Sequence, residues 1–479
     1  MGGSAFLKHS PTINIPRMPP VVFEVVLQST LNVLRKHYGH CASSIEAPGK
    51  TTFGDVDILV ASPYEMSFNP FREASGVTSP TKGSLTPVAE NLKAVLQATT
   101  YIIQPGNPTV NLAIPWPKDL DGDEEYHTQI DVHHLDTKAQ WEWEMFHSAH
   151  GDLWNILGST IRPFGLTAND IGLYLRIEDI EQLDRKKSMI FLTSVPSEVL
   201  KLLALDEDVY WKEFGSQEEM FQFATSCRMF WVKENSSEGA EGDVFGEIEG
   251  QEGGEKGKKK LKHNDRQRVR KRPIFQAWIE EFIPRLRKEG GHVEAKSTRD
   301  KIRAEAFEMF NVGEEYQRRL TEWKLARHRD ELWRDIIKGG VPDNDEIDVM
   351  FRSAATRMLK AFIMEGEDFD GTISPASKTD KDGFHDIAAV KAFVEANWEK
   401  AGKIGMARKT IKSQASMAVK EEKRKKRKAA KKQEIAKNLR DAEEREKENT
   451  VEMKVKIIVK ETAVAKDGQD ETAMFSTPA

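Results

Sequence analysis

The stretch EAPGKTTFGDVDILVASP, from Glu46 to Pro63, decides how the first half of this chain folds. It begins with residues that end in Gly49-Lys50-Thr51, which is how a phosphate-binding P-loop closes. It continues with Asp55 and Asp57, two residues apart in an apolar run, which suggests carboxylates that share a metal ion. The two interpretations require different structures after the lysine, a helix for the P-loop and a strand for the carboxylates.

The P-loop interpretation fails on two counts. A P-loop has a second glycine five residues before Gly49, since backbone N–H groups must wrap the phosphates closely, and the residue there is Ser44. A helix should also follow Lys50, whereas the residues DVDILV after Gly54 are rich in branched side chains and predict a strand. We therefore expect a strand that carries both aspartates.

The carboxylate interpretation predicts a metal site. Residues two apart on a strand point to the same side, so Asp55 and Asp57 share one face, with Val56 and Leu59 expected on the other. Carboxylates are costly to bury unpaired, and their partner is either a Lys or Arg or a divalent cation with oxygen ligands. A third carboxylate, Asp131, interrupts a second apolar strand, TQIDVHHL. If the two strands are neighbours, three carboxylates converge in the geometry that suits two Mg²⁺ (or Mn²⁺) ions.

The order of elements around these strands predicts a mixed α/β layer. A helix is expected from Pro20 to His37, then strands near Cys41–Ile45 and at DVDILV, a helix at LTPVAENLKAVLQAT, and strands at YIIQ, TVNLAI and TQIDVHHL. From Trp141 to about Trp231 the pattern is mostly helical, with FLTSV as a short strand.

At this point the sequence resembles the DNA polymerase beta superfamily of nucleotidyltransferases, and family X polymerases in particular. GDVDILVASP is similar to the metal-binding strand of that family, and QIDVHHL is similar to its third-carboxylate strand. GDLWNILGSTIRPFGLTANDIGLYL and SVPSEVLKLLALDEDVYWKEF are similar to segments of its thumb. The resemblance covers about Pro20 to Phe230, with the four segments in the family's order.

The resemblance implies a fold and a set of domains. The implied fold class is α+β: a nucleotidyltransferase palm with a mixed sheet, a helical thumb, and a mainly α-helical, partly disordered C-terminal region. The expected division is a flexible N-terminus (1–19), a palm-like domain (20–140), a thumb-like domain (141–232), an acidic then basic linker (233–272), a helical domain (273–365), a second linker (366–385), a charged helix (386–450) and a tail (451–479), in which VEMKVKIIVK alternates like a strand.

The resemblance also implies an activity. A nucleoside monophosphate would pass from an NTP or dNTP to a hydroxyl acceptor, with RNA or DNA as the expected acceptor, by a two-metal mechanism. Asp55 and Asp57 would bind both metals, and Asp131 would bind the catalytic one and help to deprotonate the acceptor. Two further groups of residues would bind the nucleotide, Ser44, Gly49, Lys50 and Gly54 around the triphosphate and Trp154 and Asn155 at the base.

Several positions depart from the family pattern. Where the family has Gly-Ser before the metal strand, this chain has Ser44-Ile45, and its phosphate-binding loop arginine corresponds to Pro48. The arginine two residues before the third aspartate is Gln129, and the aromatic pair that screens the sugar corresponds to His147 and Ser148. The short stretch before Pro20 also argues against a gap-filling polymerase. A competing hypothesis is therefore a nucleic-acid-binding or scaffold protein whose transferase core has lost activity.

Composition further narrows the classes of protein to which this chain can belong. The chain has 479 residues, of which 39% are apolar and 31% charged, and no apolar run approaches membrane-spanning length. Two cysteines cannot build a disulfide framework or a cysteine-rich zinc site, so a reducing compartment, nucleus or cytosol, is expected. The net charge is only −6, but basic blocks lie at 256–272 and from Lys420 onward. The first block favours nucleic-acid binding or nuclear entry. The second block slightly favours a solvated or coiled helix over nucleic-acid binding.

Two other motifs have plainer explanations. DLDGDEE, from Asp119, opens like a calcium loop but lacks the glycine at its sixth position and ends at Ile130 in place of glutamate, which indicates an exposed acidic turn. His133 alternates onto the face of Asp131 and so could touch a metal or substrate, but neutral packing or solvent exposure is the favoured explanation.

Overall fold

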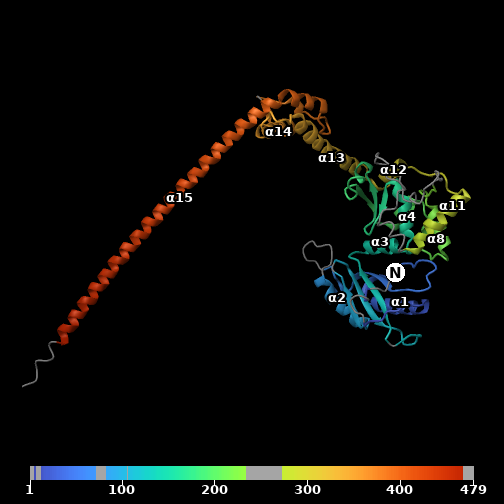
Figure 1. Ribbon diagram of the computed structural model, residues 1–479. Helices are drawn as coiled ribbons and strands as arrows, with labels where there is room; N and C mark the ends of the chain where they lie inside the picture. Colours follow the sequence, from blue (N-terminus) through green and yellow to red (C-terminus); the bar gives the residue numbers. More distant parts are fainter. Residues whose placement is uncertain are drawn as a thin grey trace, which may run out of the picture. The chain divides into compact units, whose positions relative to one another are not determined.

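The computed structural model describes residues 5–6, 12–71, 82–104, 106–123, 125–232, 272–369 and 371–467 (Figure 1). The chain forms two compact units, Met1–Trp323 and Lys324–Ala479, and the boundary between them falls inside one helix, α13 (Gly313–Glu331). Together they contain helices and a mixed sheet, so the broad α+β class is confirmed.

A five-stranded mixed sheet organises the first part of unit 1. Its strands are β1 (Tyr38–Ala42), β2 (Val56–Pro63), β3 (Thr100–Ile103), β4 (Thr109–Pro115) and β5 (His127–His134), in the spatial order β1-β2-β5-β4-β3. The central pair β2–β5 is parallel, and the other neighbours are antiparallel. The strands expected at DVDILV, YIIQ, TVNLAI and TQIDVHHL are all present.

Alternation along the central strands divides the sheet into an apolar and a polar face. Val56, Ile58 and Val60 are fully buried in one hydrophobic core with residues of α1 (Pro20–Leu34) and α2 (Lys82–Val95), two helices seen beside the sheet in Figure 1. Leu59 was expected beside Val56 but is an odd number of residues away, so it alternates onto the face of Asp57. The polar face is therefore the one that carries the aspartates.

Residues 12–19, before α1, are hydrogen-bonded to residues of the first part of unit 1. The backbone of Met18 exchanges two hydrogen bonds with Phe53, at 2.8 and 2.9 Å between N and O, and the Met18 side chain is fully buried. The N–H of His127 donates to the carbonyl oxygen of Asn14 at 2.8 Å. The expectation of a flexible N-terminus therefore does not hold for residues 12–19, because an apolar side chain and a backbone pairing fix them to the strand region.

A second hydrophobic core in unit 1 extends from Trp143 to Tyr316. It contains a three-stranded antiparallel sheet that the sequence analysis largely missed, having expected only a short strand at FLTSV. The elements of this part are α3 (Lys138–Ser148), α4 (Leu153–Ile161), η2 (Arg162–Phe164), β6 (Leu166–Ala168), β7 (Leu173–Arg176), α5 (Glu178–Glu181), β8 (Met189–Thr193), α6 (Pro196–Leu203), α7 (Glu207–Tyr210), α8 (Gln217–Ser226), α10 (Pro273–Ala277), η3 (Trp278–Phe282), α11 (Ile283–Glu289), α12 (Arg299–Phe310) and most of α13.

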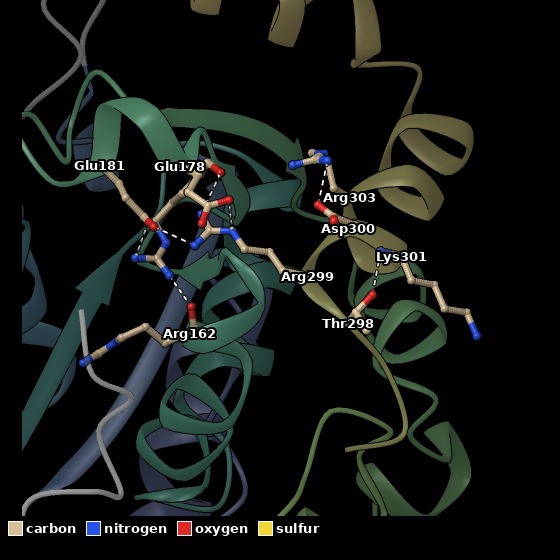
Figure 2. Close-up of polar contacts among 9 residues, drawn as sticks. Arg162, Glu178, Glu181, Thr298, Arg299, Asp300, Lys301 and Arg303 are labelled. Atoms are coloured by element: carbon tan, nitrogen blue, oxygen red, sulfur yellow. Dashed lines mark hydrogen bonds and ion pairs between the residues drawn. The ribbon is translucent and has the colours of Figure 1, made fainter. Parts of the chain in front are cut away.

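The helices after residue 272 were expected in a separate domain, but Phe275, Trp278 and Ile302 are buried in this second core. An ion cluster adds to the attachment (Figure 2). Glu181 binds two arginines, Arg176 at 2.8 Å and Arg299 of α12 at 2.7 Å between N and O. These contacts join α12 to the β7–α5 segment, so the expected boundary at 273 does not separate two cores.

Unit 2 has its own core, built from η4 (Leu332–Lys338), α14 (Val349–Met364) and the start of α15 (Ile387–Asp467). The expected linker 366–385 is folded where the structure describes it, with strands β9 (Asp368–Phe369) and β10 (Thr372–Ile373) and the short helix η5 (Pro375–Ser377). Phe369 and Ala376, the apolar residues of this polar stretch, are buried in the core. Burial of these two side chains explains why the stretch is not a free linker.

α15 is a continuous helix of 81 residues (Figure 1). It includes 451–460, where the sequence alternates like a strand, so the strand expectation is wrong. A strand needs a neighbouring strand to pair its backbone groups, whereas a helix pairs its own. Among the described helices, none combines the length and the hydropathy required to cross a membrane.

Candidate metal centre

Three carboxylates meet on the polar face of the five-stranded sheet. Asp57 of β2 lies directly opposite Asp131 of β5 in the parallel register, and Asp55 lies just before the start of β2. One ligand oxygen from each of the three residues lies within 4.8 Å of the others. The predicted convergence of Asp55, Asp57 and Asp131 is therefore confirmed, as a group that could hold a metal ion.

The proximity of these groups changes their acidity. Loss of solvation, followed by repulsion from Asp55 and Asp131, raises the pKa of Asp57 to about 7. Loss of solvation also raises the pKa of Asp131 to about 6, against the effect of hydrogen bonds that it accepts. Two carboxylates that resist ionisation lower the stability of the folded chain at neutral pH unless a cation lies against them.

Two amides orient the third carboxylate. Asn111 of β4 donates from Nδ2 to Oδ1 of Asp131 at 2.6 Å, and Gln129 of β5 donates from Nε2 to both carboxylate oxygens at 2.9 and 3.1 Å. Both amides are buried, and the backbone N–H of Ala5 donates to Oε1 of Gln129 at 3.2 Å. In the sequence, Gln129 stands out only as a missing arginine. Asn111 was not predicted, although it is the lone amide in the apolar run TVNLAI.

The loop between β1 and β2 lies beside the carboxylates. Lys50 forms an ion pair with Glu46 and lies 5.4 Å from the centroid of the Phe53 ring. Both charges affect the pKa of Asp57, which Glu46 raises and Lys50 lowers. Ser44 is half-buried. The charge of Lys50 therefore acts on Asp57 and is partly balanced by Glu46.

Gly49 has left-handed backbone (φ 76°), whereas Gly54 is buried and is not among the positive-φ glycines. Of the two glycines predicted around the triphosphate, Gly49 is therefore the one whose backbone conformation favours glycine. The other end of the loop docks on the second core: the N–H of His150 donates to the carbonyl oxygen of Ile45 at 2.7 Å. A Cβ on Gly151 would lie 2.7 Å from that of Ala47, so only glycine allows this approach.

The two residues proposed at the base, Trp154 and Asn155, have partners within the protein. Trp154 is only 5% exposed, within the second core, and its indole N–H donates to the Tyr210 hydroxyl at 3.0 Å. Asn155 is half-buried and donates from Nδ2 to Oδ1 of Asp152 at 3.2 Å. The apolar helical position of Trp154 thus reflects packing in this structure.

The remaining candidates have ordinary partners. Nδ1 of His133 lies 2.6 Å from the Thr109 hydroxyl, and burial lowers the pKa of that histidine. Asp119 lies in an exposed turn, in agreement with the sequence analysis. Across the described ranges, the three aspartates form the only group of three or more His, Cys, Asp or Glu side chains whose ligand atoms lie this close together. The basic block 256–272, apart from Arg272, and residues 468–479 of the expected tail lie outside the described residues.

Comparison with known proteins adds no relative. The chain matches no protein-family model, and no curated protein matches it.

Proposed function

We propose that this chain is a metal-dependent nucleotidyltransferase, which transfers a nucleoside monophosphate from an NTP or dNTP to a hydroxyl acceptor, with RNA or DNA as the acceptor class. The observation that carries the proposal is the juxtaposition of Asp57 and Asp131 on neighbouring parallel strands, with Asp55 close by and all three ligand oxygens within 4.8 Å.

The donor set fits Mg²⁺ or Mn²⁺. Both are hard cations that prefer carboxylate oxygens, and three carboxylates leave positions for water and phosphate oxygens. When bound, such ions supply Lewis-acid stabilisation of triphosphate charge and acidify a hydroxyl. Asp55 and Asp57 would hold both ions, and Asp131 one of them.

The chain's own residues would contribute orientation and proton transfer. Asn111 and Gln129 hold the Asp131 carboxylate in one orientation, and its pKa of about 6 suits a group that accepts a proton from an acceptor hydroxyl near neutral pH. Lys50, which lies close enough to affect Asp57, is the proposed triphosphate contact, together with Ser44.

A second candidate, a binding or scaffold protein with an inactive transferase core, is favoured by two observations. The Trp154 ring is buried, so it does not offer a face to a base, and Lys50 is paired with Glu46. Under this proposal the aspartate group would bind a cation without any transfer.

Incorporation of labelled nucleotide separates the two candidates. Each ribo- and deoxyribonucleotide is offered with Mg²⁺ or Mn²⁺ to RNA, single-stranded DNA and primed DNA. The wild type is compared with the Asp55→Ala, Asp57→Ala double variant, and Asp119→Asn, in an exposed turn, is the matched control. We expect transfer by the wild type and the control alone.

Mn²⁺ binding by the same proteins is measured in parallel. Binding without transfer in every lane supports the scaffold candidate. If neither binding nor transfer occurs in a folded protein, both candidates are refuted.

A further inference from the structure

The outer part of α15 is a solvated helix with an unusual set of apolar residues. Every side chain from 407 to 460 is exposed, including large apolar ones that are each 51–69% exposed: Ile411, Met417, Val419, Ile435, Leu439, Val451, Met453, Val455, Ile457, Ile458 and Val459. Single exposed apolar residues are common, but a series along one helix marks an interaction surface.

Seven of these eleven apolar residues are arranged symmetrically about Ile435, whereas Leu439, Val455, Ile457 and Ile458 have no large apolar counterpart on the other side. Met417 and Met453 lie equally far from it on either side, and so do the valines 419 and 451 and the pair Ile411 and Val459. The interval from Ile435 to either methionine is about five turns at 3.6 residues per turn, so all three side chains lie on one face of the helix. The face of α15 that carries Ile435 and the two methionines therefore presents the same apolar residues at equal distances on either side of Ile435.

The charges are arranged about the same centre, but with opposite signs. Residues 420–432 contain nine Lys or Arg and two Glu, whereas residues 441–448 contain five Asp or Glu and two Lys or Arg. Arg424 and Glu446 are equally far from Ile435, about three turns away, and share its face. On one face the order is thus methionine, arginine, isoleucine, glutamate, methionine.

Some of these charges have partners within the helix. Lys425 binds Glu421 at 3.3 Å, and Lys426 binds Glu422 at 2.7 Å. Neither Arg424 nor Glu446 forms an ion pair with another residue of the described chain. The charges on the symmetric face thus remain available to a partner.

We propose that α15 binds a second copy of this chain as an antiparallel pair centred on Ile435. In that arrangement Met417 lies against Met453 of the second copy, Arg424 against Glu446 of the second copy, and Ile435 against its own equivalent. A parallel pair would set each basic block against the other, which is unfavourable. A nucleic acid would suit the basic block, but it would repel the acidic one and leave the apolar symmetry unused.

Disulfide trapping in the full-length, nuclease-treated protein tests the orientation. Met417→Cys and Met453→Cys are prepared separately and oxidised either alone or after mixing; the native cysteines, Cys41 and Cys227, are both buried. We expect the mixture to form a covalent heterodimer and each single variant to remain largely uncrosslinked. Self-crosslinking of each variant alone would indicate a parallel pair and refute the proposal.

Sedimentation equilibrium tests the charge pairing. We expect a dimer at low salt whose dissociation constant rises at least tenfold in about 0.5 M NaCl, since exposed charges are screened. Glu446→Arg should weaken the dimer at least tenfold, and adding Arg424→Glu should restore it. Both residues are exposed, so folding is unaffected. A monomer at every concentration up to about 100 µM, or salt-sensitive RNA binding in place of the dimer, would overturn the proposal.

Discussion

Replacing Asp57 by asparagine should stabilise the metal-free protein. In the folded chain the carboxylate lies opposite Asp131 and close to Asp55, and its pKa rises from 3.8 to about 7. Near neutral pH the folded state must therefore either keep a proton on this group or hold repelling charges together. An amide of the same shape has no charge to hold, so the substitution removes a destabilising interaction while it also removes a metal ligand.

The sign and size of the effect follow from proton linkage. Because the folded-state pKa is raised, the folded chain binds this proton more tightly than the unfolded chain, and stability falls as the pH rises from about 4 to about 7. Each pH unit between the two pKa values corresponds to about 1.4 kcal/mol, or about 4 kcal/mol for a group fully withdrawn from water. Neighbouring groups crowd the Asp57 carboxylate, but the residue as a whole is exposed. Solvent therefore screens much of this effect, and we expect about 1–2 kcal/mol at pH 8.

Thermal unfolding from pH 5 to pH 8, with EDTA or with Mn²⁺, measures both consequences. With EDTA, Asp57→Asn should unfold roughly 2–5 °C above the wild type at pH 8, and the difference should shrink toward pH 5. With Mn²⁺ the wild type should gain stability and the variant should not. Asp119→Asn, in an exposed turn, is the control and should follow the wild type in both conditions. A variant less stable than the wild type at pH 8 in EDTA would refute the electrostatic argument.

Three further substitutions test the surroundings. Asn111→Ala removes the amide that donates to Asp131 at 2.6 Å, so the pKa of that carboxyl should rise above about 6. The pH midpoint of Mn²⁺ binding, measured by calorimetric titration, should therefore move to higher pH. An unchanged midpoint would contradict this role of Asn111. Glu181→Gln leaves the buried Arg176 without its ion-pair partner, so the free energy of unfolding, measured in urea, should fall by about 3–5 kcal/mol. Glu218→Gln, which removes an exposed ion pair, should lower it by less than about 1 kcal/mol. Trp154→Phe removes the hydrogen bond to Tyr210 and should lower the free energy of unfolding by about 1–3 kcal/mol without changing the KM for nucleotide. A large rise in KM would indicate that Trp154 contacts the base.

The carboxylates were predictable because their signal is local. Alternation in DVDILV and QIDVHHL predicts strands, and a charged residue within each apolar run marks a face that cannot be part of the core. The sequence could not show that these strands are neighbours. Parallel pairing of β2 with β5 depends on backbone groups far apart in the chain, and it alone sets Asp57 opposite Asp131.

Tertiary structure decided the remaining assignments for the same reason. Asn111 reaches Asp131 only because β4 pairs with β5. Trp154 contacts the hydroxyl of Tyr210, 56 residues further along the chain, as well as the ring of Phe146 on the preceding helix. The helices after 272 join unit 1 through Trp278 and Arg299, whose partners lie on elements before residue 232. Local sequence fixes which residues tend to form strands or helices, whereas contacts between distant residues determine which surfaces are buried and which side chains meet.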